Sequence, residues 1–317
     1  MMDWTDRHCR FLHRLFTPHA LLYTEMLVSA ALVRGAGAAR LLQHDPQEHP
    51  VALQLGGCDP KELAAAARIG AAAGFAEINL NVGCPSDRVK SGAFGACLML
   101  DPPLVAECVR RMRDATQLPV TVKCRIGIDH RDDYEFFSGF VDAVQGAGVD
   151  ALIVHARAAM LGGLTPKENR EIPPLKYDLV HRLKRERPTL PVVLNGGMAD
   201  PGAIAGHLSA GLDGVMLGRA AYHRPALLAE LEQSVVDPAW RVPQPWQIIE
   251  RMVPYARAQA RQGVRLHSIT RHMHGLMAGR EGARAWRRLL SDVAARPDAP
   301  PEALFSALAL LNQGMAA

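Results

Sequence analysis

Short runs of apolar residues recur along the first 220 residues of the chain and alternate with amphipathic, alanine-rich segments. The apolar runs, each typical of a buried β-strand, lie at residues 22–26, 51–56, 76–82, 120–125, 151–156, 192–195 and 214–217. The amphipathic segments, most of them opened by Asp-Pro or Pro, lie at residues 60–73, 102–116, 133–147, 174–187 and 201–210. This alternation predicts a parallel β-sheet covered by helices.

A closed parallel barrel needs eight strands, and the pattern supplies seven. The place left for another strand is residues 1–2, directly before a candidate helix at residues 6–16. We therefore expect an α/β fold, a (βα)8 TIM barrel. The chain would begin inside the first strand of this barrel, as it would after clipping of the N-terminus.

The pattern changes after Ala220, where the chain passes through Pro238, Pro243 and Pro245. Segments with helical periodicity follow at residues 246–262, 268–278, 283–295 and 301–311. About seventy residues are few for an independent core, so we expect this part to pack on the barrel. The predicted domains are a catalytic barrel at residues 1–236 and a small C-terminal all-helical domain at residues 237–317.

The composition and charge of the chain predict where the protein is located and what it binds. The hydrophobic content of 49% is ordinary for a globular protein. Apolar runs of membrane-spanning length are missing, and the N-terminus carries acids where a signal peptide carries bases, which predicts a cytoplasmic protein. Residues 241–296 hold eleven arginines and three acids, a net charge of +8, against −4 for the remainder. This scarcity of acids predicts contact with RNA phosphates.

One of the six cysteines stands apart from the others. The chain has no Cys-x-x-Cys pair and no histidines at zinc-ligand spacing, so neither a disulfide framework nor a metal site is expected. Cys84 follows a buried strand in Asn81-Val-Gly-Cys-Pro85 and so lies at the carboxyl end, where α/β enzymes keep their chemistry. We expect a function for Cys84, whereas Cys108 and Cys124 are expected to be small buried hydrophobes.

Polar or cationic residues stand at the carboxyl end of nearly every predicted strand. They are Gln54, Asn81, Lys123, Arg125, His155, Arg157, Asn195 and Arg219. In a packed barrel these positions converge on one mouth, which predicts a binding site. Asn195-Gly-Gly197 and Gly218-Arg219 follow the last two strands, where barrels commonly hold a phosphate.

Lys123 admits two chemistries and one structural interpretation. It could form a Schiff base, as in barrel aldolases, or stabilise negative charge on the pyrimidine edge of a reduced flavin. It could also be a lysine that only snorkels from a strand end. A phosphate cradle, a cation, a glutamine and a thiol together fit flavin mononucleotide (FMN) better than a sugar phosphate.

Nine segments carry a family resemblance. They are Met-Met-Asp-Trp-Thr-Asp-Arg-His-Cys-Arg at 1–10, Gln-Leu-Gly-Gly at 54–57, Asn-Leu-Asn-Val-Gly-Cys-Pro-Ser at 79–86, Val-Lys-Cys-Arg-Ile-Gly at 122–127, Val-His-Ala-Arg at 154–157, Pro-Lys-Glu-Asn-Arg-Glu-Ile-Pro-Pro at 166–174, Asn-Gly-Gly at 195–197, Gly-Arg-Ala at 218–220 and Ala-Arg-Ala-Trp-Arg-Arg at 283–288. Through them essentially the whole chain resembles the tRNA-dihydrouridine synthases of the A subfamily. Members of that family carry residues, including a proline, before the Met-Met pair.

The resemblance implies reduction of the D-loop uridines 20 and 20a of tRNA to 5,6-dihydrouridine, with electrons passing from NADPH through FMN. The residues it implies for FMN are Met1, Met2, Gln54, Lys123, His155, Asn195, Gly196, Gly197, Gly218 and Arg219. Those it implies for tRNA are Asn81, Arg157, Lys167, Arg170, Arg284 and Arg287. Cys84 would be the catalytic proton donor. A membrane, a metal or an obligate protein partner is not implied.

The chemistry of that reaction agrees with these residue types. Hydride from flavin N5 adds to C6 of uracil, builds enolate charge toward C5 and O4, and requires an acid that protonates C5. An ordinary thiol, with a pKa of about 8.5, is protonated at neutral pH and is available as that acid. The stacked uridine must be flipped out to reach a barrel mouth, so the arginine-rich helices are expected to hold the rest of the RNA.

Three other interpretations stay open. A flavin barrel acting on a free small molecule, such as a dihydroorotate dehydrogenase, shares the cradle and the lysine but does not require basic helices. A Schiff-base aldolase would be revealed by borohydride trapping at Lys123 and excluded by a yellow, flavin-absorbing protein. A tRNA-binding module that has lost catalysis is disfavoured because Cys84, Lys123 and His155 are all present.

Overall fold

The computed structural model describes residues 1–86, 92, 94–296 and 298–305. The chain divides into two compact units, and each is considered by itself. The sheet unit comprises Met1, Tyr23–His44 and His49–Leu217. The helical unit comprises Met2–Leu22, Asp45–Glu48 and Gly218–Ala317.

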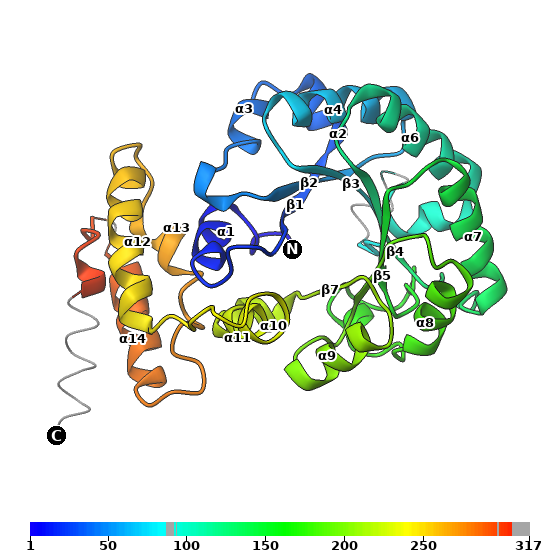
Figure 1. Cartoon of the computed structure of the whole chain (residues 1–317). Coiled ribbons are helices and arrows are strands. Elements are labelled where there is room, and N and C mark those ends of the chain that lie inside the picture. Colours follow the sequence, from blue (N-terminus) through cyan, green and yellow to red (C-terminus); the bar gives the residue numbers. More distant parts are fainter. Residues whose placement is uncertain (87–91, 93, 297, 306–317) are drawn as a thin grey trace. The chain divides into compact units, whose positions relative to one another are not determined.

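The sheet unit is built on seven strands that are hydrogen-bonded in sequence order. They are β1 (Leu22–Val28), β2 (Val51–Gly56), β3 (Glu77–Val82), β4 (Val120–Arg125), β5 (Ala151–His155), β6 (Val192–Asn195) and β7 (Gly214–Met216). Every neighbouring pair from β2 to β7 is parallel. The sheet is curled, with helices along its outer side (Figure 1), which confirms the predicted α/β fold of the TIM-barrel type.

The strand expected at residues 1–2 is wrong. Met2, Asp3 and Trp4 form a turn, and Asp3 has a left-handed backbone with φ of 61°. An extended ladder cannot pass through such a residue. Within the described residues the sheet therefore has seven strands, each at a predicted place.

Helices cover the sheet, and they include those predicted at residues 60–73, 102–116, 133–147, 174–187 and 201–210 together with short ones that the sequence did not predict. They are α2 (Ser29–Arg34), α3 (Ala38–Leu41), α4 (Pro60–Ala72), η2 (Gly95–Leu100), α6 (Pro102–Ala115), α7 (Tyr134–Gly146), η3 (Glu168–Arg170), α8 (Tyr177–Glu186) and α9 (Pro201–Ser209). The carboxylates of Asp59, Asp101, Asp133 and Asp200 accept backbone N–H bonds in the first turns of α4, α6, α7 and α9. The Asp-Pro starts are thereby confirmed, because the cap satisfies amides that the helix leaves open.

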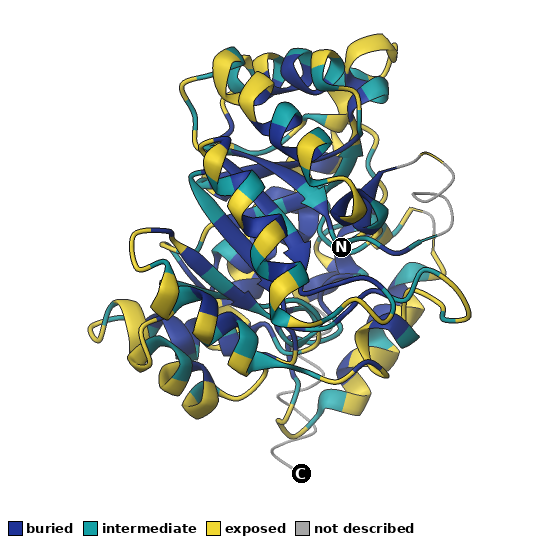
Figure 2. Ribbon diagram, turned by 90° about the vertical axis from the view of Figure 1, so that its right-hand side faces the viewer, coloured by how far each residue is buried: buried dark blue, intermediate teal, exposed yellow. Residues whose placement is uncertain are grey.

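The predicted helix at residues 174–187 begins three residues late, at Tyr177. Lys176 instead donates its backbone N–H to the carbonyl of Ala156, 2.8 Å away, beyond the end of β5. This segment is thus held on the loop that follows β5. A burial map of the ribbon shows the strands mostly buried and the helices exposed on their outer faces (Figure 2).

The helical unit joins segments from both ends of the chain. It contains α1 (Arg7–Arg14), η1 (Pro46–Glu48), α10 (Arg219–His223), α11 (Ala226–Leu231), the π-helical turn η4 (Glu232–Val236), α12 (Pro245–Ala260), α13 (Leu266–Thr270) and α14 (Ala283–Ala294). Its core cluster includes Phe11, Phe16, Met252 and Trp286. Apolar faces of α1, α12 and α14 therefore pack together.

The predicted helix at residues 268–278 is wrong beyond Thr270, because turns follow α13. Gly275, in these turns, approaches α10 closely: a Cβ atom there would lie 2.4 Å from the carbonyl oxygen of His223. Residues 306–311 of the helix predicted at 301–311 lie outside the described residues. Within the part of the chain that the structure describes, no helix is long and apolar enough to cross a membrane.

Candidate active site at the carboxyl ends of the strands

A chain of amide side chains runs across the sheet toward its carboxyl end. Asn81 Nδ2 donates to Gln54 Oε1, 2.9 Å away, and Gln54 Nε2 donates to Asn79 Oδ1, also 2.9 Å away. Asn79 Nδ2 in turn donates to Thr121 Oγ1 at 2.8 Å. The buried amides are thus satisfied by each other, which fixes the orientation of Asn81.

Asn81 also shapes the loop that carries Cys84. Its Oδ1 accepts the backbone N–H groups of Gly83 and Cys84 at 3.1 and 3.0 Å, which ends β3 in a tight turn. The Cys84 carbonyl accepts from Ala96 N at 2.9 Å, and Sγ lies 3.5 Å from Ser86 Oγ. Cys84 is of intermediate exposure, unlike the buried cysteines.

The other cysteines of interest behave differently. Cys108 and Cys124 are fully buried, with exposed fractions of 0%. Burial raises the pKa of both thiols to about 12. Both are therefore inert packing residues, as the sequence predicts.

Lys123 projects from β4 beside Asn81 of β3, its partner in the ladder. Its Nζ donates to Asn195 Oδ1, 3.1 Å away, and Asn195 Nδ2 donates to the carbonyl of Met216 at 2.8 Å. Burial, followed by the charge of Arg125, lowers the pKa of Lys123 to about 8. The hydrogen bond to Asn195 fixes the position of the Lys123 ammonium. The lowered pKa brings the loss of its charge closer to neutral pH.

Arg125 lies two residues further along β4, on the same side of the sheet, and only 4% of it is exposed. Its Nη1 lies 3.1 Å from His155 Nδ1, and burial, followed by the charges of Arg125 and Lys123, holds the pKa of His155 well below its ordinary value. His155 is thus a neutral imidazole. The sequence pattern placed Arg125 at a strand end but indicated no role for it. Side chains alternate between the two faces of a strand, so the order Lys123-Cys124-Arg125 is the signal that places Arg125 on the face of Lys123.

Lys123 and Arg125 bond to neutral groups. In the part of the chain that the structure describes, their side-chain hydrogen bonds go to amide, carbonyl and imidazole acceptors. Burial of an ion without a counter-ion costs roughly several kcal/mol. Such an arrangement favours an anionic or electron-rich ligand, whose charge would offset this cost.

Gly196 and Gly197 form a second element of the site. Both have left-handed backbone, with φ of 107° and 72°. A Cβ atom on Gly197 would lie 2.6 Å from the Tyr177 hydroxyl, and one on Gly196 would lie 3.3 Å from His155 Nε2. Tyr177 OH also donates to the Gly196 carbonyl at 2.7 Å. Glycine is therefore required at both positions by conformation and by space.

The loop after β5 is organised around one buried amide, which sequence reasoning missed. Asn169 is 0% exposed; its Oδ1 accepts from Met160 N at 2.7 Å, and its Nδ2 donates to the carbonyl of Met160 at 3.0 Å. Lys167 and Arg170, on either side of it, are exposed. Arg157, in the same loop, donates from Nη1 to the carbonyl of Pro173.

The remaining predicted residues belong to the helical unit, apart from Met1. Gly218 and Arg219 open α10, and Tyr222 of that helix stacks on Trp4 with ring centroids 4.4 Å apart. The segment that carries Met2 and the Gly218-Arg219 turn are thereby held together. Met2 itself is 58% exposed.

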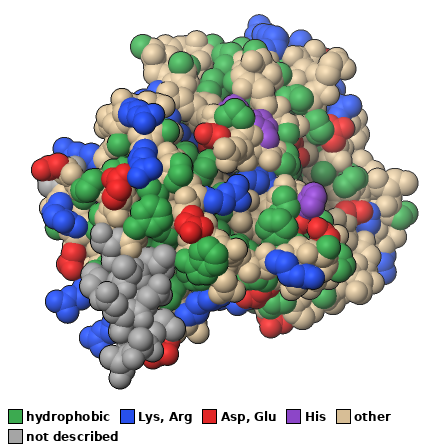
Figure 3. Space-filling view, turned by 60° about the vertical axis from the view of Figure 1, so that its left-hand side comes forward, with side chains coloured by type: hydrophobic (Ala, Val, Ile, Leu, Met, Phe, Trp, Pro, Cys, Tyr) green, Lys and Arg blue, Asp and Glu red, His purple; other side chains and the backbone are tan. Residues whose placement is uncertain are grey.

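Helix α14 presents two different faces. Arg284 and Arg287 are exposed, whereas Trp286 is fully buried and donates from Nε1 to the carbonyl of Met273 at 2.8 Å. Leu289 packs against the same core. The helix thus has an exposed face that carries arginines and an inward apolar face. In a space-filling view of one side of the molecule, Lys and Arg side chains are interspersed with apolar and acidic ones (Figure 3).

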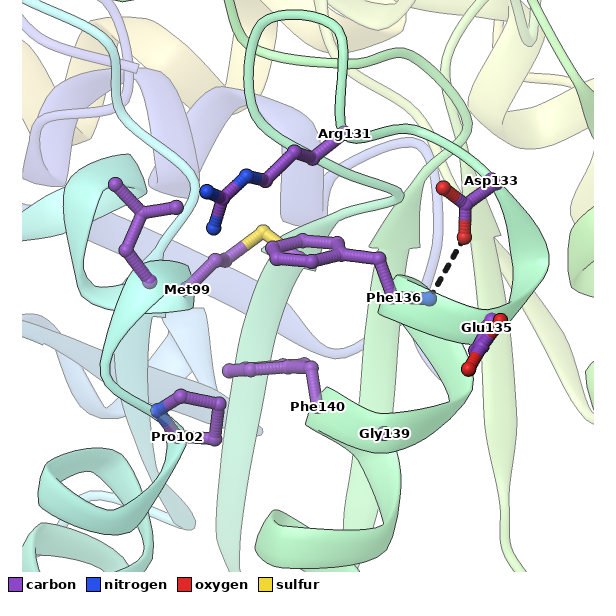
Figure 4. A pocket seen from close by; sticks show the side chains of 9 residues that line it. Met99, Pro102, Arg131, Asp133, Glu135, Phe136, Gly139 and Phe140 are labelled. Atoms are coloured by element: carbon purple, nitrogen blue, oxygen red, sulfur yellow. Dashed lines mark hydrogen bonds between the residues drawn. The ribbon is translucent and has the colours of Figure 1, made fainter.

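A separate pocket of about 440 Å³ lies between the start of α6 and α7. Met99, Phe136 and Phe140 point into it, with Arg131 at its edge (Figure 4). None of the predicted site residues lines it. We therefore assign the candidate chemistry to the strand ends, where the thiol and the cations converge, and not to this pocket. Groups of three or more potential metal-ligating side chains are absent from the described residues.

Comparison with known proteins gives one consistent result. Residues 1–311 match the family model described as dihydrouridine synthase (Dus). Proteins named tRNA-dihydrouridine(20/20a) synthase are similar over nearly the whole chain. The one from Xanthomonas campestris pv. campestris is 56% identical over 94% of this chain and 88% of its own length. Those from Synechocystis sp. and Shewanella oneidensis are 53% and 52% identical, over 97% and 92% of this chain and 92% and 86% of their own lengths.

Proposed function

The chain belongs to the dihydrouridine synthase family, and from this premise we propose that it reduces uridines 20 and 20a in the D-loop of tRNA to 5,6-dihydrouridine as a member of the A subfamily. The observation that carries the proposal is the Cys84 turn. Cys84, a residue of intermediate exposure, lies on the turn that follows β3. Asn81 accepts its backbone N–H and is the ladder partner of Lys123 on β4. The names of the similar proteins support the choice of nucleotide positions.

FMN fits the residues that the strand ends bring together. Lys123 and Arg125, which within the described residues bond to neutral acceptors, suit its anionic groups, and the left-handed Gly196-Gly197 turn follows the strand after which barrels commonly hold a phosphate. In this proposal Gln54, Lys123, His155 and Asn195 hold the ring and its ribityl chain. For Met1, Met2, Gly218 and Arg219, the support for a role with FMN is the family resemblance of their segments. Bound FMN, reduced by NADPH, would supply the hydride that C6 of uracil accepts.

Cys84 supplies the second hydrogen. When C6 has gained a hydride, negative charge on C5 and O4 must be neutralised by a proton, and the thiol S–H delivers it to C5 as a general acid. Asn81 holds the backbone of Cys84 in place through its two accepted hydrogen bonds. Lys123, when charged, stabilises electron-rich groups at the same strand ends.

The tRNA is assigned to two sets of residues. Asn81, Arg157, Lys167 and Arg170 are proposed to receive the flipped uridine and its neighbours in the sheet unit, because they stand at or beyond the strand ends. Arg284 and Arg287, in the C-terminal domain at residues 237–317, are proposed to contact phosphates. These contacts hold the RNA and carry no sequence information by themselves.

One experiment tests this function directly. Unmodified tRNA transcripts are incubated with the FMN-loaded protein and NADPH, and nucleoside mass spectrometry with mapping then locates dihydrouridine. We expect it at positions 20 and 20a. NADPH consumption without dihydrouridine, together with turnover of a free pyrimidine such as orotate, would assign the protein to the small-molecule flavin barrels instead.

A further inference from the structure

Arg125 connects three separate segments of the candidate site. Its Nε donates to the carbonyl of Gly83 at 3.1 Å, directly before Cys84. Its Nη1 donates to the carbonyl of Asn169 at 3.0 Å and to that of Ala158 at 3.4 Å, and it lies 3.1 Å from His155 Nδ1. One buried guanidinium thus contacts the Cys84 turn, the histidine at the end of β5 and the loop that carries Lys167 and Arg170.

The bond to His155 fixes a tautomer. Every nitrogen of an arginine carries hydrogen and can only donate, so His155 Nδ1 must be the acceptor. A neutral imidazole that accepts at Nδ1 carries its hydrogen on Nε2. That Nε2 edge lies against Gly196, where a Cβ atom would be 3.3 Å away. His155 therefore presents an N–H donor beside the Gly196-Gly197 turn.

The bond to Asn169 acts at the base of a rigid loop. The Asn169 side chain is enclosed by bonds to Met160, and its Nδ2 also donates to the carbonyl of Leu164 at 3.2 Å. The loop cannot shift at Asn169 without breaking these bonds together with the bond from Arg125. Since Lys167 and Arg170 flank Asn169, their positions depend on the same anchor.

We propose that Arg125 is a positioning residue that holds the Cys84 turn and the Lys167–Arg170 loop in one fixed arrangement and locks His155 as the neutral Nε2–H tautomer. This role rests on the proposed function, because it explains how a proton donor and an RNA-contacting loop from different strands keep their register. It requires the forked geometry of a guanidinium, since Nε must reach the Gly83 carbonyl while Nη1 reaches His155 and the Asn169 carbonyl. A lysine at the same position keeps the charge but cannot reach all three.

The tautomer is tested by NMR on the FMN-loaded protein labelled with ¹⁵N-histidine, using long-range ¹H–¹⁵N correlation. His155→Gln assigns the His155 signals. We expect the Nε2–H pattern in the wild type and its loss or mixing in Arg125→Met. An Nδ1–H or doubly protonated ring in the wild type would overturn the proposal even if the Arg125 variants failed to fold.

The positioning role is tested by single-turnover oxidation of the reduced flavin by tRNA, measured across tRNA concentrations. Arg125→Met is expected to lower the maximal rate by about 10²-fold, because misplacement by about an ångström costs that much. Arg125→Lys should recover only part of the loss. Lys167→Ala should instead raise the half-saturating tRNA concentration. Arg131→Met, an exposed residue on the loop after β4, serves as the matched control.

The two hypotheses fail in different ways. If wild-type reduced protein is not oxidised by any tRNA, the proposed function is wrong, and the tautomer still decides whether Arg125 orients His155. If the wild type is active and Arg125→Met matches Arg131→Met in maximal rate within about twofold, with an unchanged tautomer, the positioning role is wrong.

Discussion

The strand ends of the sheet unit and the outer face of α14 both carry clustered positive charge, but in opposite physical states. Lys123 and Arg125 are partly or fully buried, bonded in fixed directions to neutral acceptors, and have lowered pKa values. Arg284 and Arg287 are exposed to solvent. Buried charge is costly and directional, which suits one ligand in one pose. Exposed charge costs little and is screened by salt, which suits an extended polyanion.

This difference assigns the two regions different parts of one task. A buried site can distinguish between ligands, because each of its groups has one orientation. Misplacement of a group therefore lowers the affinity or the rate. A solvated arginine face can hold a large substrate through phosphates and tolerate variation in sequence. Variants at the strand ends should therefore change the chemistry, and variants on the α14 face should change only RNA binding.

The largest effect is expected at the thiol. Cys84→Ala should keep its flavin and accept electrons from NADPH. The reason is that the side-chain amide of Asn81 forms its hydrogen bond with the backbone of residue 84 and not with the sulfur. Uridine reduction should fall by roughly 10²-fold or more, the usual contribution of a positioned general acid. Single-turnover oxidation of the reduced variant by tRNA measures this step. A rate near that of the wild type would remove Cys84 from the mechanism.

Charge reversal on α14 should change binding and leave chemistry intact. Arg284→Glu combined with Arg287→Glu is expected to weaken tRNA binding by roughly tenfold or more at low salt, and to lower the log–log salt slope by roughly 0.7 to 0.9 per lost phosphate contact. Flavin reduction by NADPH should be unaffected.

The matched control is Arg40→Glu combined with Arg68→Glu, which reverses two exposed arginines of the sheet unit without an assigned RNA contact. Binding is followed across a salt series for both double variants. Equal losses in the two would mean that net charge, and not the α14 face, governs tRNA affinity.

Sequence reasoning predicted the sheet well because its signals are local. Each apolar run became a strand, and the Asp-Pro starts became capped helices. It failed at α13, which stops after Thr270; the turns that follow bring Gly275 close to the carbonyl of His223, fifty-two residues earlier in the chain. Met2 joins a turn and not a strand because the next residue, Asp3, has a left-handed backbone.

The site was predictable as a set of residues but not as a set of bonds. Parallel strands bring their carboxyl ends to one edge, so Asn81, Lys123 and His155 could be grouped in advance. The role of Arg125 depends on carbonyls 42 and 44 residues away in the sequence, and no local pattern specifies such partners, so Arg125 was assigned a place without a role. Asn169 bonds Met160, nine residues earlier, but this bond depends on the conformation of the loop, which the sequence pattern did not predict.

The pH dependence of flavin binding should be set by the buried lysine. Its lowered pKa of about 8 means that the folded protein without ligand loses the Lys123 charge as pH rises through 8, whereas an unfolded lysine stays charged to about 10.4. Anionic FMN should therefore bind several-fold more weakly at pH 9 than at pH 7, and binding above pH 8 should take up protons.

The lowered pKa of Lys123 also makes the free energy of unfolding depend on pH. Between pH 8 and about 10 the unfolded chain binds more protons at Lys123 than the folded one, so this group alone makes stability rise with pH across that window. Lys123→Met should bind FMN weakly at every pH and should lose the steep decline above pH 8. Fluorescence titration of FMN into both proteins across pH tests this, and an identical decline in the two would exclude Lys123 as its origin.

The smallest effect is expected from a neutral bond at the same strand ends. Tyr177→Phe removes the hydroxyl that donates to the Gly196 carbonyl at 2.7 Å and leaves the ring beside Gly197. Stability should fall by about 1 kcal/mol, the usual net value of one such bond. If the Gly196-Gly197 turn holds the FMN phosphate, FMN affinity should weaken by only a few-fold, since the glycines keep their conformation. Urea unfolding and FMN titration of the same preparation give both numbers. A loss of FMN binding as large as that of Lys123→Met would contradict this expectation. It would show that a neutral hydrogen bond of the site contributes as much to FMN affinity as a buried cation does.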